Sequence, residues 1–242
     1  MTVVPYKQQV GSKKEQVAQM FNKISKRYDF LNHFLSLGID ISWRKKAIKL
    51  LESQSPRHIL DIATGTGDFA IQAMCLNPEK IIGIDISKGM LAVGRRKIAE
   101  KGLQDRIDLQ LGDSENLEFN DNKFDAVIVS FGVRNFENLN RGLKEMHRVL
   151  KPQGTTVILE FSKPQQFPFK QIYGWYFKNV LPRIGRMVSK DKSAYRYLPE
   201  SVEHFPSGQG FIDELKAVGF NNCICKTVTF GVSSIYMAKK QS

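Results

Sequence analysis

Cysteine is scarce in this sequence, and long apolar runs are missing from it. Cys75, Cys223 and Cys225 have no metal-ligand spacing, and their odd number argues against a disulfide framework. The N-terminal stretch lacks an apolar signal core, and no run approaches the roughly 20 residues that span a bilayer. We therefore expect a cytoplasmic protein that is neither exported nor membrane-spanning, and we predict no metal site.

Acidic residues are also in short supply, with 24 against 36 lysines and arginines, which gives a net charge of +12. The basic excess lies between Lys7 and Lys49 and between Lys163 and Arg196, where Asp191 is the only acid. A basic field of this kind attracts nucleic acid, an anionic membrane surface or an acidic substrate, and it equally fits a plain solvated surface. Charge alone leaves these partners open.

What the sequence does contain is a regular alternation of strand-like and helix-like segments from residue 58 onward. β-branched and aromatic runs alternate with helical spacing, which is typical of a doubly wound, mainly parallel α/β sheet. In such a sheet, ligands bind beyond the carboxyl ends of the strands. The predicted strands are residues 58–64, 81–86, 107–112, 124–131 and 154–162, and the predicted helices are residues 69–76, 88–101 and 139–150.

The segments that flank this alternation predict four regions. Residues 1–55 show helical spacing interrupted near Gly38, which predicts an N-terminal helical cap before the core at 56–162. Residues 163–206 are aromatic, basic and punctuated by proline, which indicates an insertion that covers the substrate site. The last region, 207–242, contains a final helix at 208–218 and an antiparallel strand pair at 223–230 and 233–240 that complete the core.

Two glycines interrupt the first apolar run, in the stretch LDIATGTGDFA at residues 60–70. Gly65 and Gly67 predict a tight turn where a nucleotide-like ligand approaches the backbone, and Asp68 begins the following helix. The Asp68 carboxylate would repel a pyrophosphate at this turn, whereas S-adenosylmethionine carries a sulfonium and an amine and no phosphate. The loop therefore favours S-adenosylmethionine over a nicotinamide dinucleotide.

Further aspartates lie at the same edge of the predicted sheet. Asp61 lies in the first strand, Asp85 closes the second, and Asp113 follows the third, beside Ser114. Asp85 is placed to accept hydrogen bonds from two ribose hydroxyls, and Asp113 with Ser114 to bond an adenine amine and a ring nitrogen. One such aspartate alone would equally fit a helix N-cap, but several at one edge favour a ligand site.

Longer motifs resemble a known family. The stretches YDFLNHFLSLGIDISW, SFGVRNF and RVLKPQGTTVILEFS, at residues 28–43, 130–136 and 148–162, look like hallmarks of the quinone-biosynthesis C-methyltransferases. LPRIG and YRYLPESVEHFP, at residues 181–185 and 195–206, resemble the same family's substrate region, so the match is nearly full-length. These are class I S-adenosylmethionine-dependent methyltransferases, whose Rossmann-like fold is a seven-stranded sheet that ends in an antiparallel strand.

The resemblance implies C-methylation of a prenylated naphthoquinol, demethylmenaquinol to menaquinol, with a ubiquinone-precursor benzoquinol as the alternative. The stretch SFGVRNF lacks the motifs of DNA methyltransferases, so no nucleic acid partner is expected. An RNA methyltransferase or RNA-binding protein is the rival from another class. A prenylated substrate implies transient contact with an anionic membrane surface, at the inner face of the cytoplasmic membrane. Whether the chain forms a homodimer stays open.

By position, the resemblance places S-adenosylmethionine against the glycine loop and the neighbouring strand ends. Asp40 stands where many members have histidine, so we assign that position no catalytic role. The expected cofactor-binding residues are Asp61, Gly65, Thr66, Gly67, Asp85, Ile86, Asp113, Ser114 and Ser130.

Methylation of a ring carbon needs electron density, which a phenolate supplies better than a phenol. Ionising a phenol of pKa about 10 at neutral pH costs roughly 4 kcal/mol. Arg134, a permanent cation just after the fourth strand, is expected to stabilise the phenolate while Asn135 holds the other oxygen. The proton acceptor stays open among Tyr195, Tyr197, His204 and a bound water.

Overall fold

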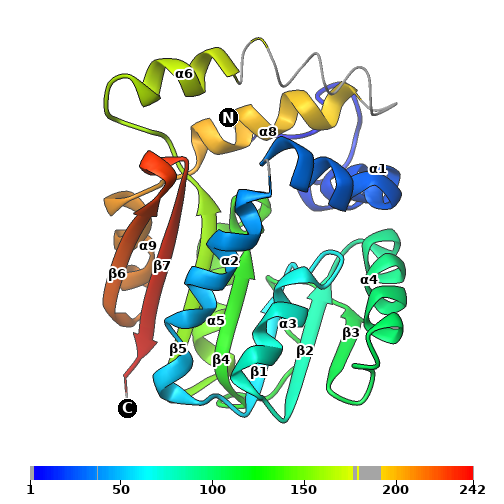
Figure 1. Cartoon of the computed structure of the whole chain (residues 1–242), viewed down its shortest axis with the longest axis vertical. Helices are drawn as coiled ribbons and strands as arrows, with labels where there is room; N and C mark the ends of the chain where they lie inside the picture. The colour runs from blue at the N-terminus through cyan, green and yellow to red at the C-terminus, as the bar shows by residue number, and fades with distance from the viewer. Residues whose placement is uncertain (1–2, 37, 177–178, 180–191, 242) are drawn as a thin grey trace.

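The structure, a computed structural model, is built on a seven-stranded sheet (Figure 1). Its strands are β1 (His58–Ile62), β2 (Lys80–Asp85), β3 (Ile107–Leu111), β4 (Phe124–Ser130), β5 (Leu150–Phe161), β6 (Phe220–Val228) and β7 (Ser233–Lys240), in the order β3-β2-β1-β4-β5-β7-β6. All pairs from β3 to β5 are parallel, and β7 runs antiparallel to both β5 and β6. The structure describes residues 3–36, 38–176, 179 and 192–241, apart from the side chains of 31–35, 192 and 194–195.

Helices cover both faces of the sheet. They are α1 (Lys13–Leu35), α2 (Ile39–Lys49), α3 (Asp68–Ala73), α4 (Lys88–Glu100), α5 (Leu139–Val149), α6 (Phe169–Trp175), α8 (Lys192–His204) and α9 (Gln209–Ala217). Alternation along the strands decides which helix packs where: on β4, Ala126 and Ile128 join the buried side chains of α2, α3 and α4. Val127 and Val129 point to the opposite face and pack with α5 and α9.

Short 3-10 turns connect several of these elements. They are η1 (Glu52–Gln54), η2 (Met74–Leu76), η3 (Val133–Asn135) and η5 (Thr229–Gly231). The third of these follows β4 directly and carries the Arg134–Asn135 pair, so it sets where these two side chains lie.

The predicted alternation is confirmed, with small differences at the ends of strands. β5 begins at Leu150 instead of Gly154, because Leu150 already pairs with Phe124 before a register shift in the ladder. The helical character of the cap is confirmed by α1 and α2. They are separated at Gly38, whose φ of 74° is a left-handed conformation that glycine adopts without strain. The antiparallel closing pair is confirmed as β6 and β7.

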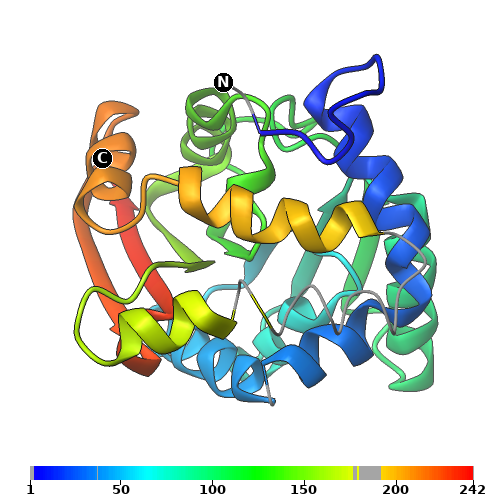
Figure 2. The same cartoon turned by 90° about the horizontal axis from the view of Figure 1, so that it is seen from above.

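Three helices lie over the carboxyl ends of the parallel strands. Figure 1 shows α1, α6 and α8 above the upper edge of the sheet, and Figure 2 shows α8 crossing that edge from above. From β1 the chain moves outward to β2 and β3, and from β4 it moves the other way to β5. The order therefore reverses between β1 and β4, which is where doubly wound sheets bind their ligands.

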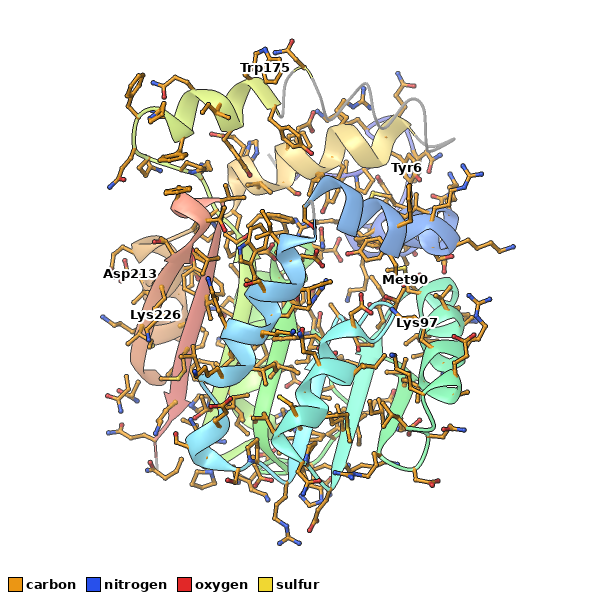
Figure 3. The ribbon with its side chains drawn as sticks, viewed as in Figure 1. Tyr6, Met90, Lys97, Trp175, Asp213 and Lys226 are labelled. Carbon is orange, nitrogen blue, oxygen red and sulfur yellow. The ribbon has the colours of Figure 1, made fainter. Side chains whose placement is uncertain are left out.

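Polar contacts hold α1 against the core. Lys97 Nζ on α4 donates to Asp29 of α1 at 2.8 Å and also pairs with Asp68 at the start of α3. Figure 3 labels Lys97 and Met90 on α4, below α1. At the same interface, Gly89 N donates to Asn22 Oδ1 at 2.7 Å. These bonds fix α1 as a roof over the strand ends.

Candidate cofactor and acceptor site

The glycine loop after β1 has a backbone geometry that lets a ligand approach the main chain closely. Gly65 and Gly67 have φ values of 58° and 79°, and Ala63 before them has a φ of 53°. Glycine adopts this left-handed region freely, whereas the Cβ of Ala63 makes it costly there. Gly65 N donates to Asp85 Oδ2 at 2.8 Å, so the loop after β1 is tied directly to the end of β2.

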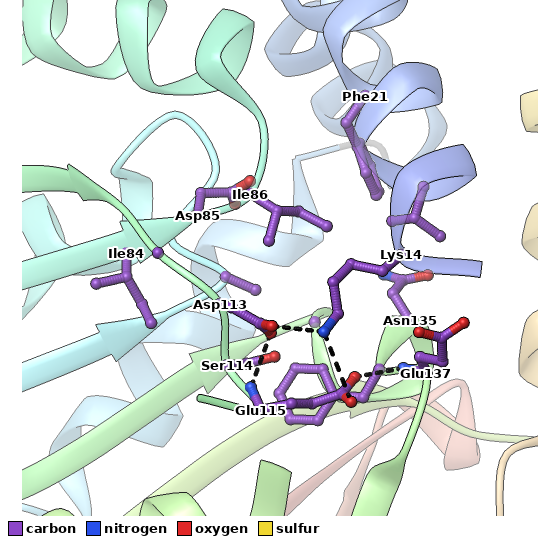
Figure 4. A pocket seen from close by; sticks show the side chains of 15 residues that line it. Lys14, Phe21, Ile84, Asp85, Ile86, Asp113, Ser114, Glu115, Asn135 and Glu137 are labelled. Carbon is purple, nitrogen blue, oxygen red and sulfur yellow. Dashed lines mark hydrogen bonds and ion pairs between the residues drawn. The ribbon is translucent and has the colours of Figure 1, made fainter. Parts of the chain in front are cut away.

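A pocket of about 490 Å³, partly open to solvent, lies beside this loop (Figure 4). The floor comes from the ends of β2, β3 and β4, and α1 forms the roof. The lining residues are Lys14, Val17, Phe21, Ala63, Ile84, Asp85, Ile86, Gly112, Asp113, Ser114, Glu115, Gly132, Asn135, Phe136 and Glu137.

The charge of this pocket is mainly negative. Asp85, Asp113, Glu115 and Glu137 line it, against the single lysine Lys14. Lys14 Nζ lies 2.5 Å from Asp113 Oδ2 and 3.8 Å from Glu115 Oε2, so the cation is already matched by two of the carboxylates (Figure 4). This excess of carboxylates attracts a cationic ligand and opposes a pyrophosphate.

Asp85 presents a fixed carboxylate at the pocket wall. Its Oδ1 accepts from Ser87 N at 2.8 Å, and its Oδ2 accepts from Gly65 N. Burial raises the pKa of Asp85 to about 6, against the lowering by the backbone N–H groups of Ser87, Gly65 and Ile86. A carboxylate has about four acceptor positions, so these N–H groups leave room for hydrogen bonding to a ribose.

Asp61 lies deeper than Asp85 and is not among the pocket-lining residues. Its Oδ2 accepts from Thr64 Oγ1 at 2.6 Å and from Ala70 N at 3.1 Å. Its Oδ1 is buried with no hydrogen-bond partner in the described part of the chain. Burial raises the pKa of Asp61 to about 7, against lowering by these two hydrogen bonds and by Arg44. A buried, unpartnered carboxylate oxygen fits an ammonium donor from a ligand.

The residues present therefore fit S-adenosylmethionine. Two observations support this fit beyond the acidic lining: the orphaned oxygen of Asp61 and that of Asn135, whose Oδ1 is buried without a partner among the described residues. Asn135 itself lines the pocket. When bound there, S-adenosylmethionine supplies an electrophilic methyl group.

Not all of the expected cofactor residues line the pocket. Thr66 Oγ1 donates to Asp29 Oδ1 of α1 at 2.5 Å, and Gly67 caps α3. Ser130 Oγ, at the end of β4, is buried without a partner in the described ranges. Asp68, which the sequence suggested would repel a pyrophosphate, is ion-paired with Lys97. The negative charge of the pocket therefore comes from other carboxylates than Asp68.

Arg134, the neighbour of Asn135 on η3, is not among the pocket-lining residues. Its Nη1 donates to Phe131 O at 2.5 Å and to Glu160 Oε1 at 2.7 Å, and its own backbone N–H donates to Glu160 Oε2. Lys13 Nζ of α1 donates to Arg134 O at 3.1 Å. Within the described residues, the guanidinium thus has one carboxylate partner, and Lys13 holds the backbone of η3.

The charge of Arg134 acts on three tyrosines of different helices: Tyr28 of α1, Tyr173 of α6 and Tyr197 of α8. Burial raises the pKa of Tyr28 to about 12, and it raises the pKa of Tyr173 and of Tyr197 as well. In all three phenols, Arg134 acts in the opposite direction and lowers the pKa. Arg134 therefore already favours the ionised form of phenols held around it.

The sequence pattern of the ubiE/COQ5 methyltransferase family matches residues 8–240 of this chain. The chain belongs to the ubiE/COQ5 methyltransferase family. Membership confirms a methyltransferase activity with S-adenosylmethionine as the methyl donor, as the loop and the acidic pocket predict. It also confirms the family resemblance carried by the three sequence motifs.

Curated relatives align over almost the whole chain. A demethylmenaquinone methyltransferase of Bacteroides fragilis is 51% identical over 231 residues, 95% of this chain and 94% of that protein. A ubiquinone/menaquinone biosynthesis C-methyltransferase of Geotalea daltonii is 45% identical over 230 residues, 94% of this chain and 97% of that protein. Among solved structures, a SAM-dependent methyltransferase of Thermotoga maritima has a TM-score of 0.65 at 19% identity, covering 92% of this chain and 99% of that one. The similarity to the Thermotoga maritima structure confirms the predicted α/β fold.

The candidate proton acceptors of this methyltransferase lie in different surroundings. Tyr197 is buried, and its Oη has no hydrogen-bond partner within the described residues. His204 is exposed at the end of α8, where its Nδ1 lies 2.9 Å from Glu200 O of the same helix. The side chain of Tyr195 lies outside the described residues. The geometry thus brings Tyr197 toward Arg134 and leaves His204 at the surface.

Sequence reasoning missed two parts of this site. Glu160 is the residue before the last in β5, close to the strand end as the expected aspartates are, so the same strand-end rule would have found it. Lys14 and Phe21 line the pocket from α1, and no local sequence signal indicates that α1 folds over the strand ends. Asp40, by contrast, is buried against Arg44 Nη1 at 2.5 Å, so an ion pair engages its carboxylate.

Proposed function

We propose that this methyltransferase transfers a methyl group from S-adenosylmethionine to a ring carbon of a prenylated naphthoquinol, converting demethylmenaquinol to menaquinol. The names of the relatives support this substrate, above all the demethylmenaquinone methyltransferase that shares 51% of aligned residues. The proposed cofactor contacts are Asp61, Gly65, Thr66, Gly67, Asp85, Ile86, Asp113, Ser114 and Ser130, and the proposed acceptor contacts are Arg134 and Asn135.

The observation that carries this proposal is that two neighbouring residues of η3 have different partners. Asn135 lines the acidic pocket, and Arg134 pairs with Glu160 and lowers the pKa of three phenols. A methyl donor in the pocket and a phenolic ring beside Arg134 would therefore meet at η3. Adjacent residues of one short turn then control both substrates of the transfer.

Arg134 would stabilise the phenolate form of the quinol, which places electron density on the ring carbon beside it. That carbon forms its bond to the methyl group while the sulfonium sulfur keeps the electrons of the bond that breaks. The ring hydrogen leaves afterwards as a proton. We propose a water bound beside the buried Oη of Tyr197 as the first acceptor of the quinol hydroxyl proton. Burial raises the pKa of Tyr197, so its phenol stays protonated and orients that water instead of accepting the proton itself.

A second candidate substrate, the benzoquinol precursor of ubiquinone, is supported by the Geotalea daltonii relative, whose name covers both quinones. Phenolate stabilisation by Arg134 would serve either ring. An RNA substrate is disfavoured by the acidic lining of the pocket, because phosphate groups would meet its carboxylates.

We further propose that the enzyme works in the cytoplasm, in transient contact with an anionic membrane surface that holds its prenylated acceptor, and that residues 163–206 cover the acceptor site. None of the helices in the described ranges is long and apolar enough to cross a membrane. The net charge of +12 supports attraction to anionic lipid.

Mass analysis of the quinones in a deletion strain tests the substrate directly. We expect accumulation of a naphthoquinone lighter by one methyl group, and its loss when the wild-type gene is restored. Accumulation of a benzoquinone lighter by one methyl group would favour the second candidate. An unchanged quinone pool would refute both.

A further inference from the structure

The outer side of α6 and the tip of η5 expose large apolar side chains close together. Phe167, Ile172, Trp175 and Phe230 are between 57% and 81% exposed. Figure 3 labels Trp175 at the top of α6, pointing away from the sheet. Single exposed apolar residues are common, but two aromatics and an isoleucine within nine residues, joined by Phe230, mark a surface that contacts something apolar.

The backbone holds Phe230 in this position at a cost. Thr229 and Phe230 have φ values of 46° and 56°, a left-handed conformation that side chains with a Cβ rarely adopt. Phe230 stacks on Phe169 of α6 with ring centroids 3.7 Å apart, and Thr229 Oγ1 accepts from Trp43 Nε1 at 2.8 Å. Stacking therefore joins η5 to α6, and the hydrogen bond joins η5 to α2.

The same helix also carries a phenol that is turned inward. Tyr173 lies between Ile172 and Trp175 in sequence, but its Oη is buried, where Arg134 and Glu160 act on its pKa. α6 therefore has a phenol on its inner side and apolar side chains on its outer side.

We propose that Phe167, Ile172, Trp175 and Phe230 form a docking face that inserts into the interface of an anionic phospholipid bilayer, where the prenylated acceptor is taken up. The proposal rests on the proposed function for the identity of the acceptor. Charge agrees with a bilayer: in the described stretch 163–176, the only charged residues are Lys170 and Lys163, of which Lys163 also pairs with Glu203 of α8 at 3.5 Å. Aromatic side chains beside lysines are typical of segments that bind at the membrane interface.

Trp175 can report insertion directly, because the chain has only two tryptophans and Trp43 is buried in the core. In the full-length wild-type protein, we expect tryptophan emission to shift to shorter wavelength with vesicles of phosphatidylcholine and phosphatidylglycerol, because Trp175 is exposed and the buried Trp43 does not reach lipid. Brominated phosphatidylcholine in those vesicles should quench it. Emission that stays unshifted and unquenched while the protein sediments with the vesicles would overturn the proposal.

A matched pair of variants tests the face itself. The triple variant Phe167→Ser, Ile172→Ser, Phe230→Ser should partition to mixed vesicles at least tenfold more weakly, roughly as expected for losing several inserted apolar side chains. Ile224→Ser removes an exposed apolar side chain from the edge strand β6 and should leave partitioning unchanged. An equal loss in both variants would overturn the proposal, because it would indicate general apolar adhesion.

Activity and oligomeric state separate this proposal from its alternatives. With a water-soluble, short-chain naphthoquinol, the triple variant should keep wild-type kcat/KM, whereas with the prenylated quinol in vesicles its KM should rise about as much as partitioning falls. Insertion of Trp175 without methylation of any quinol would refute the proposed function and leave the docking face standing. If the triple variant instead turns a dimer into a monomer and still binds vesicles normally, the face is an interface between two copies and the proposal is wrong.

Discussion

Nη1 of Arg134 and Oε1 of Glu160 are 2.7 Å apart, in a pair whose side chains are 7% and 0% exposed. Burial raises the pKa of Glu160, and the Arg134 cation opposes that rise. Oε1 of Glu160 also accepts from Phe161 N at 2.8 Å, so the carboxylate is held by its own strand. β5 therefore fixes the direction of the Arg134 guanidinium through Glu160, and Glu160 acts on the acceptor site as a positioning residue.

The Arg134→Lys variant should separate chemistry from binding. Lysine keeps the charge but loses the planar two-pronged geometry, so we expect kcat to fall by roughly 100-fold while the Kd of S-adenosylmethionine changes little. Raising the pH should partly restore the rate, because it forms phenolate without the enzyme's help. We would measure kcat against pH and a melting curve for each protein. A destabilised variant with a normal pH–rate profile would mean that the ion pair is only structural.

The Glu160→Gln variant should have the opposite effect on the pH profile. Glutamine can still bond Arg134, but the buried cation loses its counter-charge, so the free energy of unfolding should fall by about 3 kcal/mol. The uncompensated Arg134 should stabilise a bound phenolate more strongly, which moves the acidic limb of the kcat–pH profile to lower pH. Denaturant titration and the pH profile check the two parts. Identical shifts in the Arg134→Lys and Glu160→Gln profiles would contradict this account of Glu160.

Asp85→Ala should weaken the binding of S-adenosylmethionine by about 1–3 kcal/mol, because two ribose hydroxyls lose their acceptor. The variant also frees Gly65 N and Ser87 N, so the loop after β1 should lose order as well. Calorimetric titration measures the affinity. Asp105→Ala, which removes an exposed carboxylate before β3, is the control and should bind normally. Unchanged affinity in Asp85→Ala would remove this residue from the site.

Asp61→Asn should stabilise the ligand-free protein at high pH and abolish tight cofactor binding. Because burial raises the folded pKa of Asp61 to about 7, the folded state holds a proton that the unfolded chain releases near pH 4. The stability due to that proton is present below about pH 4 and is lost as the pH rises to about 7. Asparagine does not titrate, so the Tm of the variant should exceed that of the wild type more at about pH 8 than at about pH 5. Melting curves without ligand check this, and a pH-independent difference in Tm would contradict it.

The sequence by itself determined the sheet and the edge at which the site lies. The β-branched and aromatic runs identify β1 to β5 because strands that lie between two helix layers are buried on both faces, and this composition is a local signal. Gly65, Gly67 and Asp85 could be placed for a similar reason. A parallel sheet brings the carboxyl ends of its strands to one edge, so their order along the chain is enough.

Only the tertiary structure decided which side chains meet at that edge. Lys14 pairs with Asp113, which is 99 positions away in the sequence, and Arg134 pairs with Glu160, which is 26 positions away. Neither pairing follows from a local sequence period. Likewise, Tyr197 and His204 are candidate proton acceptors seven residues apart on α8. Tyr197 lies in the interior, whereas His204 lies at the surface. Residues seven apart lie on nearly the same face of a helix, so their place along α8 makes the difference: Tyr197 packs against α1, and His204 ends the helix. The contacts of α8 with α1 and η3 join residues far apart in the sequence, so they form only when the chain is folded.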